Sequence, residues 1–194
     1  NSYRSKNKTL YYGSTIYPVK TTEKNTELHW KYGSSIEAKR KKDVFSSHHF
    51  LISKNYFSEN KISFNENIAS YGYEDVFFVL ENNIKTIYIK NPLLHIGIKK
   101  TAKFIKQTES ALKNLSNQHQ FTTNADQIIR MLYFQKKISN MGLTKLILNI
   151  FNMSKGIILK NLHSKNPSIW LFQFYKLGFF LQLKTDQILM KKRQ

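Results

Sequence analysis

Two adjacent carboxylates, Glu74 and Asp75, are the residues of this sequence best suited to acid–base chemistry. They follow Tyr71-Gly72-Tyr73, and the apolar residues after them recur at helical spacing. Both carboxylates are therefore predicted to lie at the start of a helix, where free backbone N–H groups and the helix dipole favour the ionised form. An ionised carboxylate can act as a general base. Gly72 supplies backbone freedom for the turn, and Tyr71 and Tyr73 offer flat faces for a sugar or another ring.

The same stretch also fits an ordinary capped helix. Asp is a preferred N-cap residue, and Glu is common in a first helical turn. The residues of this stretch leave both interpretations open.

A second polar group, Ser46-Ser47-His48-His49, stands at the mouth of an apolar segment predicted to be a strand. Ligand contacts are common at this position in α/β proteins. Adjacent strand residues point to opposite faces, so at most one of the two histidines is expected to face a site. The alternative for each is a surface or hydrogen-bonded histidine, which we favour for His48.

His95 lies in a loop between Asn91-Pro92 and Gly97. A neutral imidazole in such a loop could be offered to a metal ion or a phosphate. A lone histidine in a loop is also typically just a hydrogen-bonding residue. The spacing alone favours this second interpretation.

The composition limits the kind of protein. A chain of 194 residues is long enough for one domain with a real core, or for one domain with a small appendage. The absence of cysteine excludes a disulfide framework and a thiolate metal site. The sequence opens on Asn1, shows no signal-peptide pattern, and is expected to begin at a fragment boundary.

The formal net charge of +19 would attract the chain to a polyanion such as nucleic acid, anionic lipid or a nucleotide diphosphate. Only Lys39–Lys42 and Lys191–Arg193 are dense basic runs. A lysine-rich solvated surface explains the charge at least as well as a nucleic-acid footprint.

The chain is expected to contain short strands followed by helices. Strands are predicted at Leu10–Tyr17, within 44–57 and at Ile84–Ile89, and helical segments at 28–36, from Glu74 to about Asn82, at 99–117, 125–139, 142–162 and 168–190. A polar linker at 118–124 marks a predicted boundary. The last helix is rich in aromatic residues but is interrupted by Lys176, so we do not predict that it spans a membrane. It could lie on a membrane surface, although packing against the rest of the chain as core is the favoured interpretation.

Several of these segments together resemble the second half of a bacterial family 2 glycosyltransferase. They are Ser46–Lys54, Tyr71–Asp75, Asn91–Gly97 and the helix from Phe104 to Leu115, with Tyr175–Phe180 resembling the helical tail of such proteins. The resemblance covers about residues 10–120 well and the tail loosely. It implies an α/β fold class, namely a partial GT-A fold that lacks its N-terminal nucleotide-binding half. Residues 1–120 would form the acceptor side of the catalytic domain, and residues 121–194 an α-helical extension.

The resemblance implies inverting sugar transfer from a nucleotide-sugar donor to a hydroxyl of a glycan or lipid-linked acceptor, in cell-surface polysaccharide or glycan synthesis. Asp75 would be the general base, and Glu74 would position the acceptor or the base. Ser47, His49, Gly72 and Tyr73 would contact substrate, although the family more often has Asn where His49 stands. His95 would contact a divalent metal, Mg or Mn, or the diphosphate. The protein would be cytoplasmic, with peripheral contact to the cytoplasmic face of the membrane through its C-terminal helices.

The sequence departs from the family in one respect. The family has a metal-binding Asp-x-Asp element, whereas the aspartates here, Asp43, Asp75, Asp126 and Asp186, are all isolated. We therefore expect the chain to be the C-terminal part of a longer enzyme that by itself lacks the donor-nucleotide site. Two alternatives are a non-catalytic basic module that binds nucleic acid, and an inactive fragment whose tail contacts membrane or a partner protein. No nucleic-acid-binding motif is present, so nucleic acid is not an expected partner.

Overall fold

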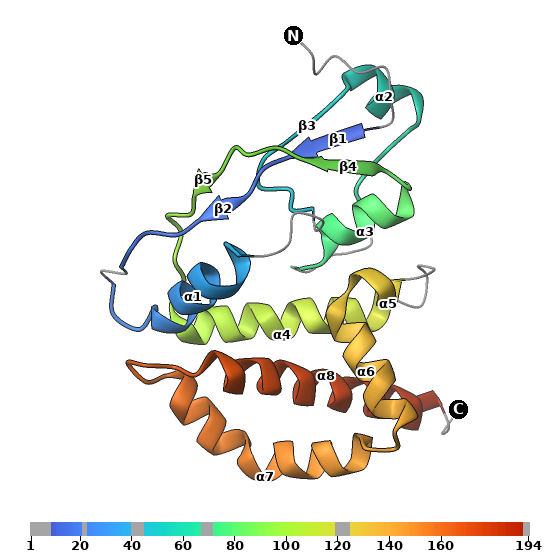
Figure 1. Cartoon of the computed structure of the whole chain (residues 1–194). Helices are drawn as coiled ribbons and strands as arrows, with labels where there is room; N and C mark the ends of the chain where they lie inside the picture. The colour runs from blue at the N-terminus through green and yellow to red at the C-terminus, as the bar shows by residue number, and fades with distance from the viewer. Residues whose placement is uncertain (1–8, 21–22, 40–44, 67–71, 119–124, 192–194) are drawn as a thin grey trace.

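Two small sheets lie above a layer of helices in a mixed α/β arrangement (Figure 1). The computed structural model describes residues 9–20, 23–39, 45–66, 72–118 and 125–191. The predicted α/β class is confirmed at this level. Residues 40–42 of the first basic run, Tyr71, most of the predicted linker and the last basic residues lie outside the described residues.

The larger sheet has the strand order β3-β1-β4. Its central strand β1 (Thr9–Tyr12) is antiparallel to β3 (Phe50–Ile52) and parallel to β4 (Lys85–Tyr88). The smaller sheet pairs β2 (Thr15–Ile16) with β5 (Leu93–Leu94), again in parallel. The strand predicted at 10–17 is thus two strands, because the chain turns from one sheet to the other between Tyr12 and Thr15.

The larger sheet is covered by the helix that follows the carboxylate motif. Helix α3 (Glu74–Glu81) begins and ends as predicted, with Asn82 as its C-cap. Its Phe78 packs in a buried cluster with Leu10 and Tyr12 of β1, and the Phe64 ring stacks on it with centroids 4.2 Å apart. The short strand predicted within 44–57 is β3, and a short helix α2 (Lys54–Glu59), capped by the Ser53 side chain, follows it.

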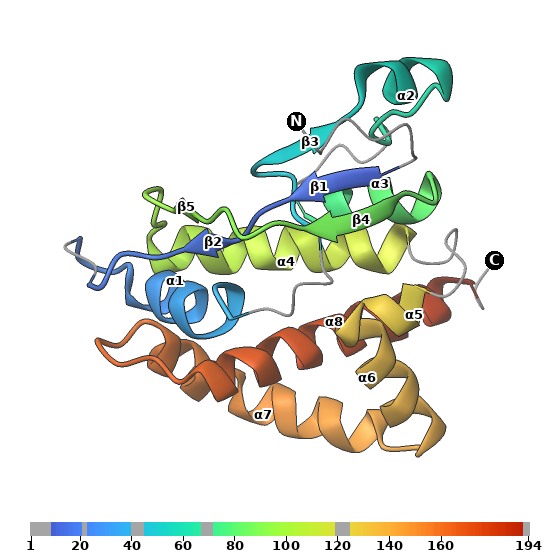
Figure 2. The ribbon, with the colours of Figure 1, turned by 45° about the horizontal axis from the view of Figure 1, so that its top comes forward.

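Helix α4 (Thr101–Gln118) is the predicted amphipathic helix at 99–117, and it lies on the sheet side of α7 (Thr144–Leu162) and α8 (Ile169–Lys191) in both views (Figure 2). Near its start it packs against α1 (Glu27–Tyr32), which continues as a π-helical turn, η1 (Gly33–Glu37). Phe104 and Ile105 contribute to a buried cluster that also holds residues of α1. Helix α4 therefore connects the layer of strands to the layer of helices.

The C-terminal part is helical, as predicted. It comprises α5 (Ala125–Ile128), α6 (Arg130–Asn140), α7 (Thr144–Leu162) and α8 (Ile169–Lys191). Helix α8 lies between α4 and α7, and buries Phe172, Tyr175 and Phe180. Tyr175 donates a hydrogen bond to Glu109 of α4, and burial raises its pKa. The favoured interpretation of the last helix as core is confirmed.

Buried clusters combine side chains from both sides of residue 120. One joins α1 and α4 with α7 and α8, and a second joins α3 and α4 with α5, α6 and α8. The division at residue 120 stays a prediction. None of the helices in the described residues is both long and apolar enough to cross a bilayer.

Helices α7 and α8 are in close contact at Gly178, and this contact yields a stability prediction. A Cβ on Gly178 would overlap the ring and Cβ of the buried Phe151. We expect Gly178→Ala to lower the free energy of unfolding by about 1–3 kcal/mol, the usual cost of overpacking. Urea unfolding followed by circular dichroism measures this change.

Gly156 in α7 provides the matched control, because no atom lies within 4 Å of its Cβ position. Here Gly156→Ala should raise stability by about 0.5–1 kcal/mol through helix propensity. Equal effects of the two substitutions would contradict the close packing of α7 on α8.

Candidate functional site

The candidate site is built where two parallel strand pairs pass from the larger sheet to the smaller one. Ile89 N–H donates to the Tyr12 carbonyl, and Leu93 N–H donates to the Ser14 carbonyl, at 2.8 and 3.0 Å. The segment Gly13–Thr15 is thereby held beside the segment Lys90–Pro92. We call these two paired segments, Gly13–Thr15 and Lys90–Pro92, the strand crossing. Polar side chains from three other parts of the chain lie around it.

His49 packs against the strand crossing, next to Gly13 and Asn91. Its Nε2 donates to the Asn91 carbonyl at 2.6 Å. The other ring nitrogen, Nδ1, is buried and has no hydrogen-bond partner among the described residues. A Cβ on Gly13 would overlap both His49 Nε2 and the Asn91 carbonyl, so only glycine fits there.

His48 joins the same group and is exposed and hydrogen-bonded, which confirms the favoured interpretation of His48 as a surface or hydrogen-bonded histidine. The expectation that at most one of the two histidines faces a site stays a prediction, but the reason given for it fails. Both precede β3 and lie in a turn, so strand alternation does not apply; their ring centroids are 4.5 Å apart. His48 Nε2 lies 3.0 Å from Thr15 Oγ1. Burial, aided by the charges of His49 and His95, lowers the pKa of His48 against the opposing effects of Ser14 and Asp75. His48 is therefore held neutral near pH 7.

Asp75 is bound by Ser47 through two hydrogen bonds. The Ser47 backbone N–H donates to Oδ2 at 2.9 Å, and the Ser47 hydroxyl donates to Oδ1 at 3.0 Å. The structure thus brings together two of the predicted site residues, which are separated by 28 positions in the sequence. The carboxylate has a fixed orientation beside the histidine pair.

Glu74 has a local contact instead. Its Oε2 accepts a 2.6 Å hydrogen bond from the Gly72 backbone N–H. Gly72 has φ +110°, and Tyr73, the N-cap of α3, has φ +68°. Tyr73 is half-buried against the cluster around Phe77 and Leu112, so part of its ring surface is already used in packing.

His95 lies at one end of the site, among aromatic rings. Its ring is 5.0 Å from that of Tyr17 and 5.4 Å from that of His29, measured between centroids. Tyr17 in turn donates a hydrogen bond to Glu37. His95 Nε2 is buried and has no hydrogen-bond partner among the described residues.

Sequence reasoning missed His29, whose ring lies beside that of His95. It is buried in α1, stacks on Phe104 with ring centroids 4.3 Å apart, and accepts a 2.7 Å hydrogen bond at Nδ1 from the Lys99 backbone N–H. The sequence places a histidine in a helical segment but carries no sign that residues 66 and 70 positions later meet it. Only its place beside the predicted apolar position Leu28 could have suggested burial.

A divalent metal was expected at His95. The unpartnered Nε2 atom can serve as one ligand. No group of three or more His, Asp or Glu side chains that could hold a metal ion occurs in the described part of the chain. A divalent metal at His95 stays a prediction.

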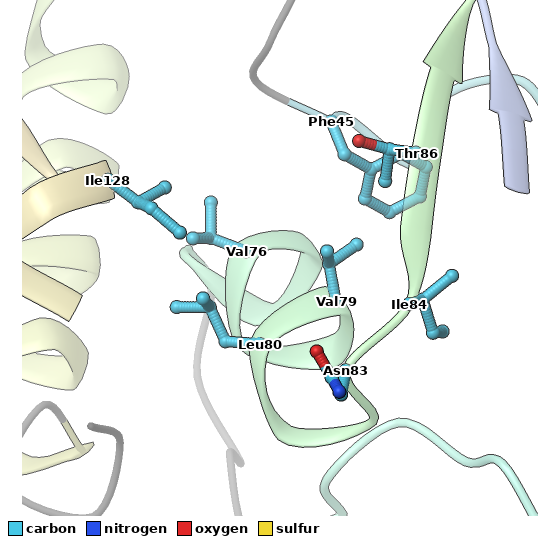
Figure 3. Close-up of a pocket in the computed structure, with 8 residues that line it drawn as sticks. All are labelled: Phe45, Val76, Val79, Leu80, Asn83, Ile84, Thr86 and Ile128. Carbon is cyan, nitrogen blue, oxygen red and sulfur yellow. The ribbon is translucent and has the colours of Figure 1, made fainter. Parts of the chain in front are cut away.

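A pocket of about 250 Å³ lies apart from this polar site (Figure 3). It is lined mainly by the apolar side chains of α3, with Ile128 of α5 and Phe45 on either side. Val76, Val79 and Leu80 face it, whereas Asp75 binds Ser47. Its lining offers no acid–base group, so we do not place chemistry there.

Comparisons with protein-family models, with curated proteins and with solved structures find no match for this chain. The resemblance to family 2 glycosyltransferases therefore stays a prediction.

The burial of His29 predicts a pH dependence of stability. Burial and the charges of His95 and Lys99 lower its pKa from 6.5 to about 4. Between these pH values the unfolded chain binds a proton that the folded chain excludes, so stability is full above about pH 6.5 and falls as the pH drops toward 4. The loss should amount to about 3 kcal/mol.

His29→Gln removes this titration and retains an acceptor for the Lys99 N–H. Urea unfolding of both proteins at pH 7 and pH 4 isolates the contribution of His29. All other titrating groups are present in both proteins, so their effect on the free energy of unfolding cancels in the comparison. The variant should lose about 3 kcal/mol less than the parent over this range. The same loss in both proteins would rule out a buried neutral His29.

Proposed function

We propose that this chain forms the acceptor side of an inverting glycosyltransferase that uses a nucleotide-sugar donor, with a partial GT-A fold. The contact between Ser47 and Asp75 carries the proposal. It joins two of the segments on which the resemblance rests and gives a carboxylate a fixed orientation at the carboxyl ends of parallel strands, where α/β proteins commonly bind ligands.

In this proposal Asp75 is the general base. The acceptor hydroxyl attacks the anomeric carbon and a C–O bond forms there, while the bond from that carbon to the donor diphosphate breaks. The acceptor proton passes to Asp75, and the electron pair of the broken bond goes to the diphosphate oxygen. Attack from the face opposite the leaving group inverts the configuration.

The hydrogen bonds from Ser47 are compatible with this role. An ionised carboxylate has about four acceptor positions on its two oxygens, and Ser47 uses one on each oxygen. A position on each oxygen is therefore left for the hydroxyl. Holding the base in one orientation reduces the ordering that the transition state requires.

The histidine pair would line the donor sugar. His48, neutral near pH 7, and His49, whose Nδ1 has no hydrogen-bond partner among the described residues, offer hydrogen-bonding groups beside Asp75. Glu74 would act through the Gly72 turn, because its carboxylate already binds the Gly72 N–H. Gly72 and Tyr73 would then shape the turn on which the acceptor rests.

A divalent cation, Mg or Mn, belongs to the proposal. When bound, it would neutralise charge that develops on the leaving diphosphate. His95 would supply one ligand through Nε2, which is buried and unpartnered among the described residues. Because the sequence contains no Asp-x-Asp, the carboxylate ligands and the nucleotide site would come from another part of the protein.

The role of Asp75 is tested by Asp75→Asn in the full-length protein that contains this chain. Asparagine keeps the size and can still accept from Ser47, but it cannot take the proton. We expect kcat to fall by about 10²–10⁴, the usual contribution of a general base, with binding of the nucleotide unchanged. Release of nucleoside diphosphate from a panel of nucleotide-sugars, with lipid-linked glycans as acceptors, measures kcat.

Asp186→Asn is the matched control, since Asp186 is an exposed carboxylate of α8, and it should retain full activity. Equal rates of transfer by the Asp75 and Asp186 variants would show that Asp75 is not the general base. The 194 residues tested alone should show no transfer, and turnover by them would contradict the placement of the donor site elsewhere.

Ser47 is proposed as a positioning residue, and its variants make a separate prediction. Ser47→Ala removes the hydroxyl donor but keeps the backbone one. We expect kcat to fall about tenfold, the cost of losing one hydrogen bond to a charged group, with little change in KM. Ser47→Thr should restore most of the rate, because it returns the hydroxyl. A purely structural role would instead lower the stability of both variants and leave their kcat similar.

A further inference from the structure

Helix α7 exposes a continuous apolar stripe. Leu146, Ile150, Met153 and Ile157 are 55, 48, 86 and 74% exposed. Their spacing of four, three and four residues places them on one face of the helix. Four large apolar side chains in a row on one exposed helix face are unusual for a water-facing surface.

The stripe lies on the side of α7 that faces away from the rest of the chain. The other side buries Phe151, Ile158 and Leu162 in the cluster shared with α8. Figures 1 and 2 both show α7 as the outermost helix, with α8 between it and α4. Helix α7 already contributes three buried side chains to the core from its other side, so the exposed stripe is not required for folding.

The part of the sequence that contains the stripe carries only positively charged side chains. From residue 127 to residue 185 the sequence contains nine Lys or Arg and no Asp or Glu. Lys145 and Lys160, near the two ends of the stripe, are both exposed. An apolar stripe flanked by lysines and free of carboxylates fits the boundary of an anionic lipid bilayer, with side chains among the acyl chains and ammonium groups at lipid phosphates.

We propose that the outer face of α7 lies on the surface of an anionic membrane. Leu146, Ile150, Met153 and Ile157 insert at the boundary between headgroups and acyl chains, and Lys145 and Lys160 bind the phosphates. This assignment is independent of the proposed transfer reaction. It moves the expected membrane contact from the aromatic last helix, which is core, to the helix before it.

A second copy of the chain is a poorer occupant of this face. Two α7 helices packed stripe to stripe would bring their flanking lysines together, and residues 127–185 contain no carboxylate to pair with them. Like charges placed opposite each other disfavour association. An anionic bilayer supplies the missing negative charge.

Sedimentation with vesicles tests the proposal. Full-length protein should bind vesicles of phosphatidylglycerol and phosphatidylcholine, and bind pure phosphatidylcholine vesicles far more weakly. Met153→Ser combined with Ile157→Ser should weaken binding at least about tenfold, since two apolar side chains leave the bilayer. Lys145→Gln with Lys160→Gln should weaken it about 25-fold, or about fivefold for each lysine. These positions are exposed, and circular dichroism checks that the variants fold.

The absence of cysteine allows the contact to be located. An environment-sensitive fluorophore at Met153→Cys should shift to the blue and brighten on the anionic vesicles. The same label at Glu59→Cys, an exposed position of α2 far from α7 in both views, should not change. Ile96→Ser, which alters an 84% exposed apolar residue in the layer of strands, is the matched control for the serine variants and should bind normally.

Three results would overturn the proposal. One is equal binding of anionic and neutral vesicles. Another is vesicle binding that the serine variants leave intact, which would indicate charge attraction without insertion. The third is a concentration-dependent dimer in analytical ultracentrifugation that Met153→Ser dissociates, which would assign the face to a second copy.

Discussion

The close approach of the Gly72 backbone to helix α4 determines where the carboxylate pair lies. A Cβ at Gly72 would overlap Ala111, and φ of +110° is a conformation that side chains disfavour. The Gly72 carbonyl accepts from the Asn114 side chain at 3.4 Å, so α4 holds the turn from a second position. Helix α3 starts two residues later. Any shift of this turn away from α4 would move the start of α3, and with it the contact between Asp75 and Ser47.

The two carboxylates have different partners, and this bears on the interpretation of the motif as a plain capped helix. Glu74 binds the Gly72 N–H in the turn that precedes α3, and the N-cap residue Tyr73 makes no side-chain capping bond. Asp75 instead reaches a separate segment and accepts both donors of Ser47. A local turn contact explains Glu74 but gives no reason for an aspartate whose partner lies 28 residues away. The Ser47 contact is what makes Asp75 the better candidate for chemistry.

Periodicity in the sequence was sufficient to predict α3, α4, α7 and α8, because each has a regular apolar face or a clear stop such as Asn82. The break between β1 and β2 was missed because Gly13 stands within a β-prone run, and its need for glycine depends on His49 and Asn91. The geometry of the histidine pair was predicted wrongly because strand alternation was applied to two residues that lie in the turn before β3, where the rings come to 4.5 Å between centroids. His29 was missed altogether. Its contacts with His95 and Lys99 are long-range, and no local pattern encodes them.

The charge is distributed more unevenly along the chain than the total of +19 suggests. Residues 1–126 contain nineteen Lys or Arg and eleven Asp or Glu, whereas residues 127–185 contain nine and none. Glu74 and Asp75 thus lie outside the acid-free stretch, which includes the whole of α7. Helices α4 and α8 lie between the strand crossing and α7 in both views. A bilayer bound at α7 would therefore lie on the far side of two helices from Asp75. In the proposed transfer reaction, that geometry would suit an acceptor whose growing end extends away from the membrane, as a glycan chain does, better than a hydroxyl at the lipid headgroup itself.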